Sequence, residues 1–135
     1  MDETDMRLVQ LLRSNGRASF TELAKELGTS EGTVRGRVKR LVEDGVIRKF
    51  TIETRGQFVK ALIEVQVASN VNSPTVASQI RAWDGVDHVW EVTGEDDIVV
   101  VADCRDTGKL NHLIDAIRAI EGTNSTRSRL ILQDF

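Results

Sequence analysis

The chain has 135 residues, of which 40% are hydrophobic and 29% charged, and its formal net charge at pH 7 is −3. This composition is typical of an ordered globular protein and excludes a long disordered tail. The longest apolar run, residues 98–102, is far shorter than the ~20 residues of a membrane span, and the acidic N-terminus lacks a secretory signal's basic region. We therefore expect a cytoplasmic protein. The single cysteine, Cys104, excludes an intrachain disulfide and a multi-cysteine zinc site.

The charge is unevenly distributed along the chain. Residues 1–54 carry ten Lys and Arg against nine Asp and Glu, whereas residues 55–135 carry eight against twelve. Four cations fall within residues 35–40, in the sequence "RGRVKR". This local basic cluster is hidden by the acidic overall balance and favours a polyanionic partner for the first part of the chain.

Apolar spacing predicts three helices in the first part, over residues 5–14, 20–27 and 31–44. The residues expected at their ends are Ser19 or Thr21 and Ser30 as N-caps, with Gly16 (as a left-handed cap), Gly28 and Gly45 as terminators. The second and third helices are separated only by a short turn, which is the arrangement of a helix-turn-helix.

The third helix has an unusual outer face. On a helical wheel, Gly32 and Gly36 lie opposite the apolar stripe, together with cationic side chains. Each glycine costs about 1 kcal/mol of helix stability, but a bare backbone approaches another surface closely. We therefore predict insertion into the major groove of DNA, with Arg37 as the base reader and Lys39 on phosphate. The predicted DNA-contacting residues are Thr21, Ser30, Gly32, Thr33, Arg35, Gly36, Arg37, Lys39 and Arg40. The alternative is a solvated helix face that tolerates two glycines.

The second part alternates strands and helices. A β-branched stretch at 46–54 predicts a strand, followed by a hinge and a turn near 55–57. The further predicted elements are strands at 61–69, 86–92, 97–104 and 128–135 and helices at 74–83 and 106–122, with Ser73 as N-cap, Pro74 at the first helical position, and a hairpin at 93–97.

An internal repeat organises these elements. The sequences "IRAWDG" at 80–85 and "IRAIEG" at 117–122 match at four of six positions, each at the same point of a strand-helix-strand unit. Two such units give β-α-β-β-α-β, with a four-stranded antiparallel sheet and both helices on one face. The other face then requires cover, for which a second subunit is the simplest source.

The chain resembles the Lrp/AsnC (feast/famine) family of transcription regulators along almost its full length. The resemblance rests on "DETDMRLVQLLRSNGRASFTELAKELGTSEGTVRGRVKRLVEDGVI" and, more weakly, on "VTGEDDIVVVADC". It implies an α+β protein, with a winged-type helix-turn-helix over residues 1–54 and a ferredoxin-like effector and dimerisation domain over residues 55–135. It also implies double-stranded DNA and a small effector, usually an amino acid, as partners, and a homodimer or a tetramer of dimers.

The same resemblance implies an effector site near the glycine of the hairpin. Carried over to this chain, it indicates Gly94 and Asp97, with Thr126 and Ser128 on the facing C-terminal segment. Asp96 stands where the family often has an aromatic residue. The backbone at Gly94 allows amides to approach a carboxylate, and Asp96 or Asp97 offers a partner for an α-ammonium group. The alternative is that the acids only favour the turn.

Three other functions were weighed. A sirohaem-decarboxylase-like enzyme would need basic and histidine residues around a tetrapyrrole, but the second part is acidic and holds only His88 and His112. A Cys104–His112 nucleophile pair has no orienting third group. We therefore expect neither an enzyme nor a cofactor. A chromatin-like protein that coats DNA without sequence choice remains open, because phosphate contacts alone support it.

Overall fold

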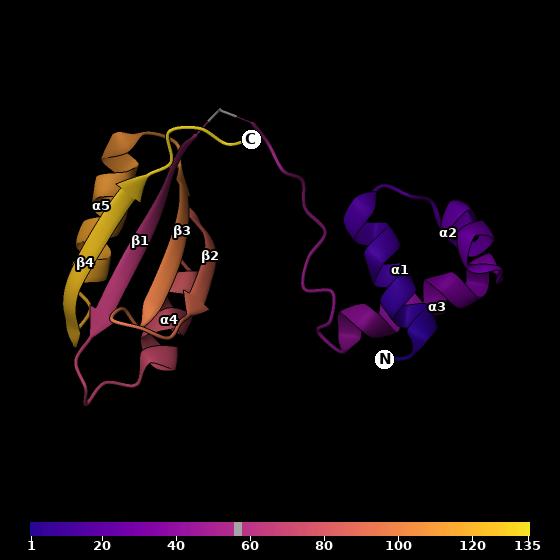
Figure 1. The fold of residues 1–135 in the computed structure, drawn as a ribbon, viewed down its shortest axis with the longest axis horizontal. Helices are drawn as coiled ribbons and strands as arrows, with labels where there is room; N and C mark the ends of the chain where they lie inside the picture. The colour runs from indigo at the N-terminus through magenta and orange to yellow at the C-terminus, as the bar shows by residue number, and fades with distance from the viewer. Residues whose placement is uncertain (56–57) are drawn as a thin grey trace. The chain divides into compact units, whose positions relative to one another are not determined.

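The computed structural model describes residues 1–55 and 58–135, which divide into two compact units, Met1–Glu53 and Thr54–Phe135 (Figure 1). The turn predicted at 55–57 includes residues 56 and 57, which lie outside the described residues. Each unit has a separate apolar core.

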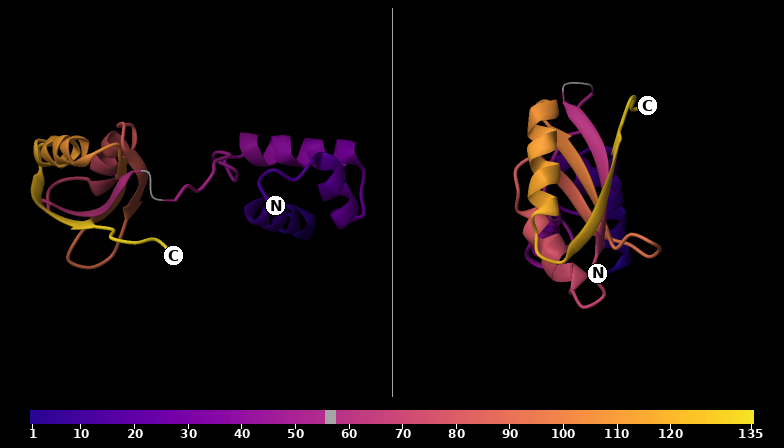
Figure 2. Two further views of the ribbon diagram at one scale, coloured as in Figure 1. Left: turned by 90° about the horizontal axis from the view of Figure 1, so that it is seen from above. Right: turned by 90° about the vertical axis from the view of Figure 1, so that its left-hand side faces the viewer.

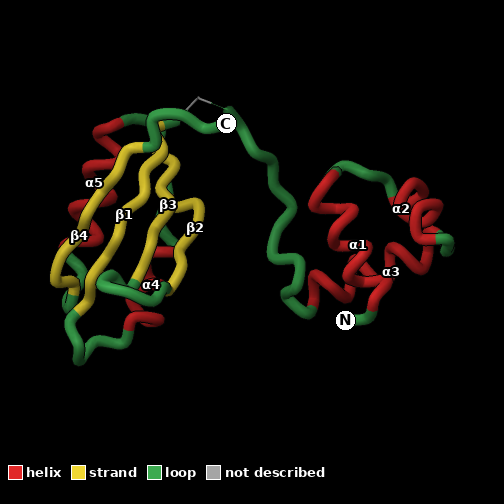
Figure 3. Tube along the Cα trace, in the orientation of Figure 1, coloured by secondary structure: helices red, strands yellow, loops and turns green. Residues whose placement is uncertain are grey.

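The first unit consists of three helices, α1 (Glu3–Ser14), α2 (Phe20–Leu27) and α3 (Glu31–Glu43) (Figure 3). As predicted, Ser30 caps α3, and Ser19 caps α2 in a reciprocal capping box with Glu22. Gly28 ends α2 in the left-handed conformation, with φ of 63°. The predicted helix-turn-helix is confirmed.

The predicted left-handed cap at Gly16 is wrong. The chain leaves α1 at Asn15, whose backbone is extended and whose amide donates to the Leu11 carbonyl. The Asn15 side chain then accepts a hydrogen bond from the Arg17 amide at 3.1 Å. An asparagine turn of this kind reverses the chain without any residue of positive φ.

The helices enclose an apolar core that includes Leu8 from α1, Leu23 from α2 and Val34 and Leu41 from α3. One charged side chain, Asp5, is nonetheless buried, with 3% of its surface exposed. It lies in the first turn of α1, where it forms a capping box with Asp2. This explains why α1 begins two residues earlier than predicted.

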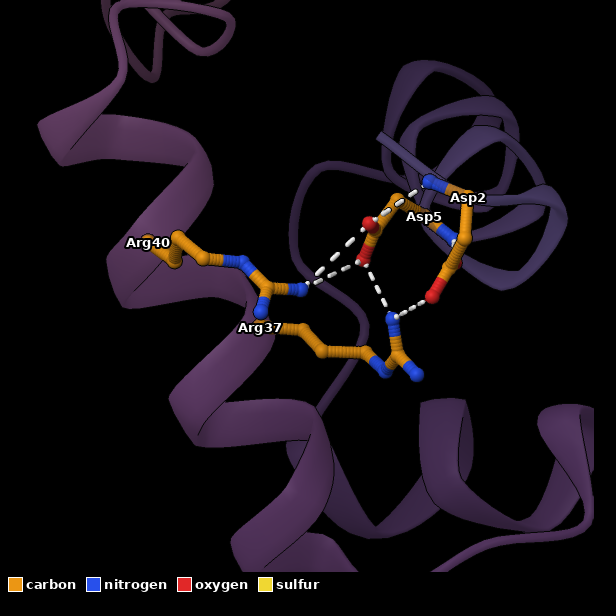
Figure 4. Close-up of polar contacts among 4 residues, drawn as sticks. All are labelled: Asp2, Asp5, Arg37 and Arg40. Carbon is orange, nitrogen blue, oxygen red and sulfur yellow. Dashed lines mark hydrogen bonds and ion pairs between the residues drawn. The ribbon is translucent and has the colours of Figure 1, made fainter.

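Two arginines of α3 reach the first turn of α1 (Figure 4). The Arg37 Nη1 atom donates to Asp2 Oδ2 and to Asp5 Oδ1, each at 2.7 Å. Arg40 approaches both Asp5 oxygens at 3.4 Å. We call these four side chains the α1–α3 clamp. It ties the start of α1 to the middle of α3.

Residues 46–55 do not form the predicted strand, so the first unit lacks the strand element of a winged helix-turn-helix. A strand needs a neighbour to accept and donate its backbone hydrogen bonds, and none of the described chain pairs with this segment. Phe50 and Ile52 are consequently 58% and 77% exposed. The β-branched composition favours extended backbone but supplies no partner.

The second unit is the predicted βαββαβ fold. Its elements are β1 (Val59–Val67), α4 (Ser73–Arg81), β2 (Val86–Glu91), β3 (Ile98–Cys104), α5 (Thr107–Arg118) and β4 (Thr123–Leu130). The strand order is β2-β3-β1-β4 with antiparallel pairing throughout. Both helices lie on the same side of the sheet (Figure 2).

The covered face of the sheet forms the core. Ile63 and Val65 of β1, and Ile98 and Val100 of β3, are fully buried. The alternate residues of the central strands (Leu62, Glu64, Val99 and Val101) define what we call the open face, and none of the four is fully buried. Successive residues of β1 thus alternate between the covered face and the open face.

Several predicted boundaries in this unit are wrong, and the helix predicted over 106–122 ends at Arg118. Asn72 rather than Ser73 caps α4, because its side chain accepts from the Thr75 amide and Ser73 is already helical. The last strand covers Thr123–Leu130 instead of 128–135. Its polar sequence is compatible with an edge strand that is only partly covered. The predicted repeat is confirmed, since Gly85 and Gly122, at the ends of the two repeated sequences, both have positive φ.

We expect Asp5→Asn to destabilise the first unit in a pH-dependent way. The Asp2 amide and the Arg37 guanidinium lower the pKa of Asp5 from 3.8 to about 2. A carboxylate with a lowered folded-state pKa contributes stability above its unfolded pKa, and the contribution is lost as pH falls through the folded value. The stability difference between wild type and Asp5→Asn should be largest at neutral pH and shrink between about pH 4 and pH 2.

Urea unfolding followed by circular dichroism at several pH values measures this difference. Glu3→Gln is the matched control, because among the described residues the exposed Glu3 has no hydrogen bond or ion pair. It should have almost no effect. A stability difference for Asp5→Asn that is independent of pH would contradict the assignment to the carboxylate charge.

Candidate nucleic-acid interface and effector site

The outer face of α3 has exposed backbone at the two glycines, Gly32 and Gly36. A Cβ atom added at Gly32 or at Gly36 would meet nothing within 4 Å. No packing contact in the described structure therefore requires glycine at either position. The two glycines instead leave a strip of exposed helix backbone beside Thr33, which is also exposed.

Three hydroxyl groups gather around the turn between α2 and α3. The Ser30 and Thr33 hydroxyls are 2.8 Å apart, and the Thr33 amide donates to Ser30 Oγ. The Thr21 hydroxyl donates to Glu31 Oε2 at 3.1 Å. The structure thus brings the predicted residues Thr21, Ser30 and Thr33 close to the N-terminus of α3. A helix N-terminus flanked by hydroxyls is suited to phosphate and base-edge contacts.

The two most exposed cations of α3 are Lys39 and Arg35. Lys39 and Arg35 have side-chain exposures of 76% and 63%, and each forms an ion pair with an acid one turn away, Glu43 at 3.7 Å and Glu31 at 2.8 Å. The Arg35 guanidinium also lies over the Phe20 ring, 5.0 Å from its centre. Exposed pairs of this kind contribute little stability, so both cations are available to a polyanion.

Arg37 does not lie free on the outer face, in contrast to its prediction as the base reader. Its side chain is only 22% exposed and is bound in the α1–α3 clamp. Arg40, which the helical wheel placed outward, also bends toward Asp5, although 56% of its side chain stays exposed. A wheel projects Cα positions, whereas a long arginine side chain reaches sideways to the nearest carboxylate. The signal for this pairing was the spacing of Asp2 and Asp5 in "MDETD".

The candidate effector residues of the hairpin have separate roles. Gly94 has φ of 121°, a conformation that side chains rarely adopt, and it is exposed. Asp97 closes the hairpin against β1: its amide donates to the Val65 carbonyl at 3.0 Å, and its Oδ2 accepts from the Val67 amide at 2.9 Å. Asp97 is therefore bound to β1 through both its backbone and its side chain.

Asp96 belongs to a charge network on the open face. Arg127 Nη2 of β4 donates to Asp96 Oδ2 at 2.5 Å, and Arg127 also pairs with Glu64 at 3.5 Å and Glu95 at 3.9 Å. Arg129 pairs with Glu64 at 3.4 Å. The bond to Asp96 and the nearby acids raise the pKa of Arg127 above its ordinary value. The sequence did not indicate Glu64, which becomes part of the network through strand pairing with Arg127.

Within one chain, Thr126 and Ser128 do not converge with the hairpin acids. They pair in register with Val65 and Ile63, so their side chains lie on the helix-covered face. The Thr126 hydroxyl accepts a hydrogen bond from Arg118 Nε of α5 at 2.9 Å. Arg127, between them, points to the open face where Asp96 lies. Because side chains alternate along β4, the predicted effector residues lie on two opposite faces of the sheet.

Cys104 is buried and its sulfur lies 3.8 Å from the Gly85 carbonyl oxygen. Burial raises the pKa of the Cys104 thiol, so the thiol is a poor nucleophile at neutral pH. Among the described residues, no group of histidine, cysteine and acidic side chains is arranged to hold a metal ion. No helix within the same residues is both long and apolar enough to cross a membrane.

Comparisons with known proteins cover both units. Residues 1–42 match the AsnC-type helix-turn-helix domain, and residues 60–135 match the Lrp/AsnC ligand binding domain. The HTH-type transcriptional regulator LysM of Saccharolobus solfataricus is 35% identical over 136 residues, covering 100% of this chain and 96% of the relative. The regulator FL11 of Pyrococcus abyssi is 34% identical over 137 residues, covering 98% and 90%.

Solved structures of other proteins superpose on this chain over both units. MtbAldR superposes with a TM-score of 0.87 at 28% identity, covering 100% of this chain and 93% of that one. The Mycobacterium tuberculosis leucine response regulatory protein gives 0.84 at 26% identity, covering 100% and 94%. E. coli AsnC gives 0.70 at 28% identity, covering 99% and 93%. With an AsnC-type helix-turn-helix followed by an Lrp/AsnC ligand binding domain, the chain belongs to the Lrp/AsnC family of transcriptional regulators.

Proposed function

We propose that this regulator reads a specific double-stranded DNA sequence through residues 1–54 and responds to a free amino acid through residues 55–135. The observation that carries the first half is the outer face of α3, where Gly32 and Gly36 expose helix backbone between polar and cationic side chains. No packing contact among the described residues requires exposed backbone at these positions. Binding in a DNA groove does require it, since the helix must approach the base edges closely.

We propose revised roles for the residues of α3. Ser30 and Thr33, at the exposed N-terminal end, are the candidates for base-edge contacts, while Arg35 and Lys39 are placed for phosphate and Thr21 for the backbone at the start of α2. Arg40, half exposed, remains a phosphate candidate. Arg37 is withdrawn as base reader because its guanidinium is bound to α1.

A second copy of the chain is proposed to cover the open face. Trp90 of β2 pairs in register with Val99 and stacks on His88, with 48% of its surface exposed. An apolar strip of this kind on one side of a sheet favours burial against another sheet. Two-fold pairing would present two α3 helices to a pseudo-palindromic site, and pairing of dimers would extend the assembly to a tetramer of dimers. We place the protein in the cytoplasm, where it meets DNA.

The effector proposal rests on the hairpin and the Asp96–Arg127 pair. Gly94 leaves the backbone open, and the pair offers a carboxylate and a guanidinium side by side, which suits the ammonium and carboxylate groups of an amino acid. The leucine response regulatory protein, by its name, responds to an amino acid. Thr126 and Ser128 of a neighbouring copy are the proposed remaining contacts.

Gly36→Leu should weaken specific DNA binding by about tenfold or more, because a leucine on the exposed strip keeps α3 from the groove. The variant should fold, since the added side chain meets nothing and leucine favours helix over glycine. Fluorescence anisotropy on DNA from upstream of the protein's own gene, against a scrambled duplex, measures the effect. Gln10→Leu, at an exposed position of α1, is the matched control. Wild-type affinity in Gly36→Leu would place the interface elsewhere.

Lys39→Ala should weaken binding to specific and scrambled duplexes equally and reduce the slope of log affinity against log salt by about one. Lys39 is an exposed cation with a single weak ion pair, so its loss removes one phosphate contact and little else. A titration over a salt series reports both quantities. If wild type itself binds the two duplexes equally and salt abolishes both complexes, the protein coats DNA without sequence choice.

An effector amino acid should raise the melting temperature of wild type and fail to do so for Arg127→Gln. Loss of one charged hydrogen bond to the effector carboxylate corresponds to a roughly tenfold or greater loss of affinity. A panel of amino acids screened by thermal shift identifies the effector. Arg105→Gln is the control, because the exposed Arg105 forms no ion pair among the described residues. Equal shifts in Arg127→Gln and Arg105→Gln would move the effector away from the hairpin.

A further inference from the structure

The four cations of α3 fall into two classes. Arg35 and Lys39 point outward and pair only with acids of their own helix. Arg37 and Arg40 instead bind Asp2 and Asp5 across the helix interface (Figure 4). Half of the basic cluster that the sequence offers to DNA is therefore held by carboxylates of another helix.

The clamp is balanced in charge. Its two arginines face two carboxylates, and hydrogen bonds lower the pKa of Asp2 and of Asp5 while they raise the pKa of Arg37, so these three groups stay ionised at neutral pH. The Arg37 Nη1 atom donates to both carboxylates, and these are charged hydrogen bonds of the kind that an arginine also makes to a phosphate. Asp2 and Asp5 thus compete with DNA for the same donors.

The geometry points to Asp2 and Asp5 as specificity-determining residues, which withhold Arg37 from DNA phosphates and so suppress non-specific binding. This inference rests on the proposed DNA-binding function. Non-specific affinity rises with each phosphate neutralised, whereas base reading by the Ser30 end of α3 does not use Arg37. Occupying Arg37 within the protein therefore raises the ratio of specific to non-specific affinity.

Asp2 is the residue whose substitution tests the inference. Its side chain is 55% exposed, whereas that of Asp5 is 4% exposed and contributes to folding. Replacing Asp2 with asparagine leaves two arginines facing one carboxylate, and the uncompensated positive charge then favours an external anion. The buried part of the clamp stays in place, so the fold should be retained.

Asp2→Asn should increase affinity for a scrambled duplex by about tenfold at low salt, steepen the salt slope by about one, and lower the ratio of specific to scrambled affinity. Glu3→Gln is the matched control, since it removes the same charge from an adjacent, unpaired residue of α1. General repulsion between an acid and DNA would appear equally in both variants, whereas the withheld arginine appears only in Asp2→Asn.

A double-mutant cycle with Arg37→Gln assigns the effect to the arginine. In the Arg37→Gln background, Asp2→Asn should change affinity no more than Glu3→Gln does. A full effect of Asp2→Asn without Arg37, or equal effects of Asp2→Asn and Glu3→Gln, overturns the inference. Wild-type protein that binds neither duplex at any salt concentration instead refutes the proposed function, so the two failures are distinct.

Discussion

The buried carboxylate of Asp5 is the constraint on which the arrangement of the first unit depends. A charge that is only 3% exposed must be neutralised, and Arg37 and Arg40 of α3 are the side chains that do so. The core alone, built from apolar side chains of three short helices, fixes the packing less specifically than a directional ion pair does. The same contact that orients α3 against α1 thereby decides which of its cations remain for a partner.

The second unit is governed by a sheet with helices on one face only. The buried residues of β1 and β3 account for its core, and the remaining face is left with Trp90, Leu62 and a charge network centred on Arg127. Apolar and charged groups thus occupy opposite edges of that face, because β2 and β4 are its two outer strands. An apolar region bordered by ion pairs is what an oligomer interface with a polar rim requires.

Periodicity and capping were sufficient to predict the elements of both units and the order of the second. The helix-turn-helix followed from Ser30 and Gly28, and the sheet from the repeat that ends at Gly85 and Gly122. Failures arose where the outcome depends on a partner that local sequence does not contain. Residues 46–54 have strand composition without a neighbouring strand, and the polar residues 123–127 of β4 were left out of the strand predicted at 128–135.

Side-chain roles were harder to predict for the same reason. The position of Arg37 on a wheel was correct as geometry but said nothing of Asp2 and Asp5, which lie more than 30 residues earlier in the chain. The family resemblance grouped Thr126 and Ser128 with the hairpin acids, yet the alternation of side chains along β4 places them on the other face of the sheet. The Asp97 side chain, in turn, is hydrogen-bonded to the β1 backbone. Long-range pairing, not residue type, decides these cases.

The two charge networks share an arrangement that connects structure to regulation. In each, a guanidinium is held by shielded carboxylates and by a more exposed one. Around Arg37 these are Asp5 and the more exposed Asp2, and around Arg127 they are Asp96 and Glu64 and the more exposed Glu95. The shielded acid keeps the cation in position, while the exposed acid is the partner that an incoming anion replaces most easily. On the proposed function, the anion in the second unit is an effector carboxylate, whereas in the first unit Asp2 stays in place and keeps Arg37 from DNA phosphates. Effector binding then exchanges one ion pair of Arg127 for another without creating an unpaired charge, which would cost far more than the exchange itself.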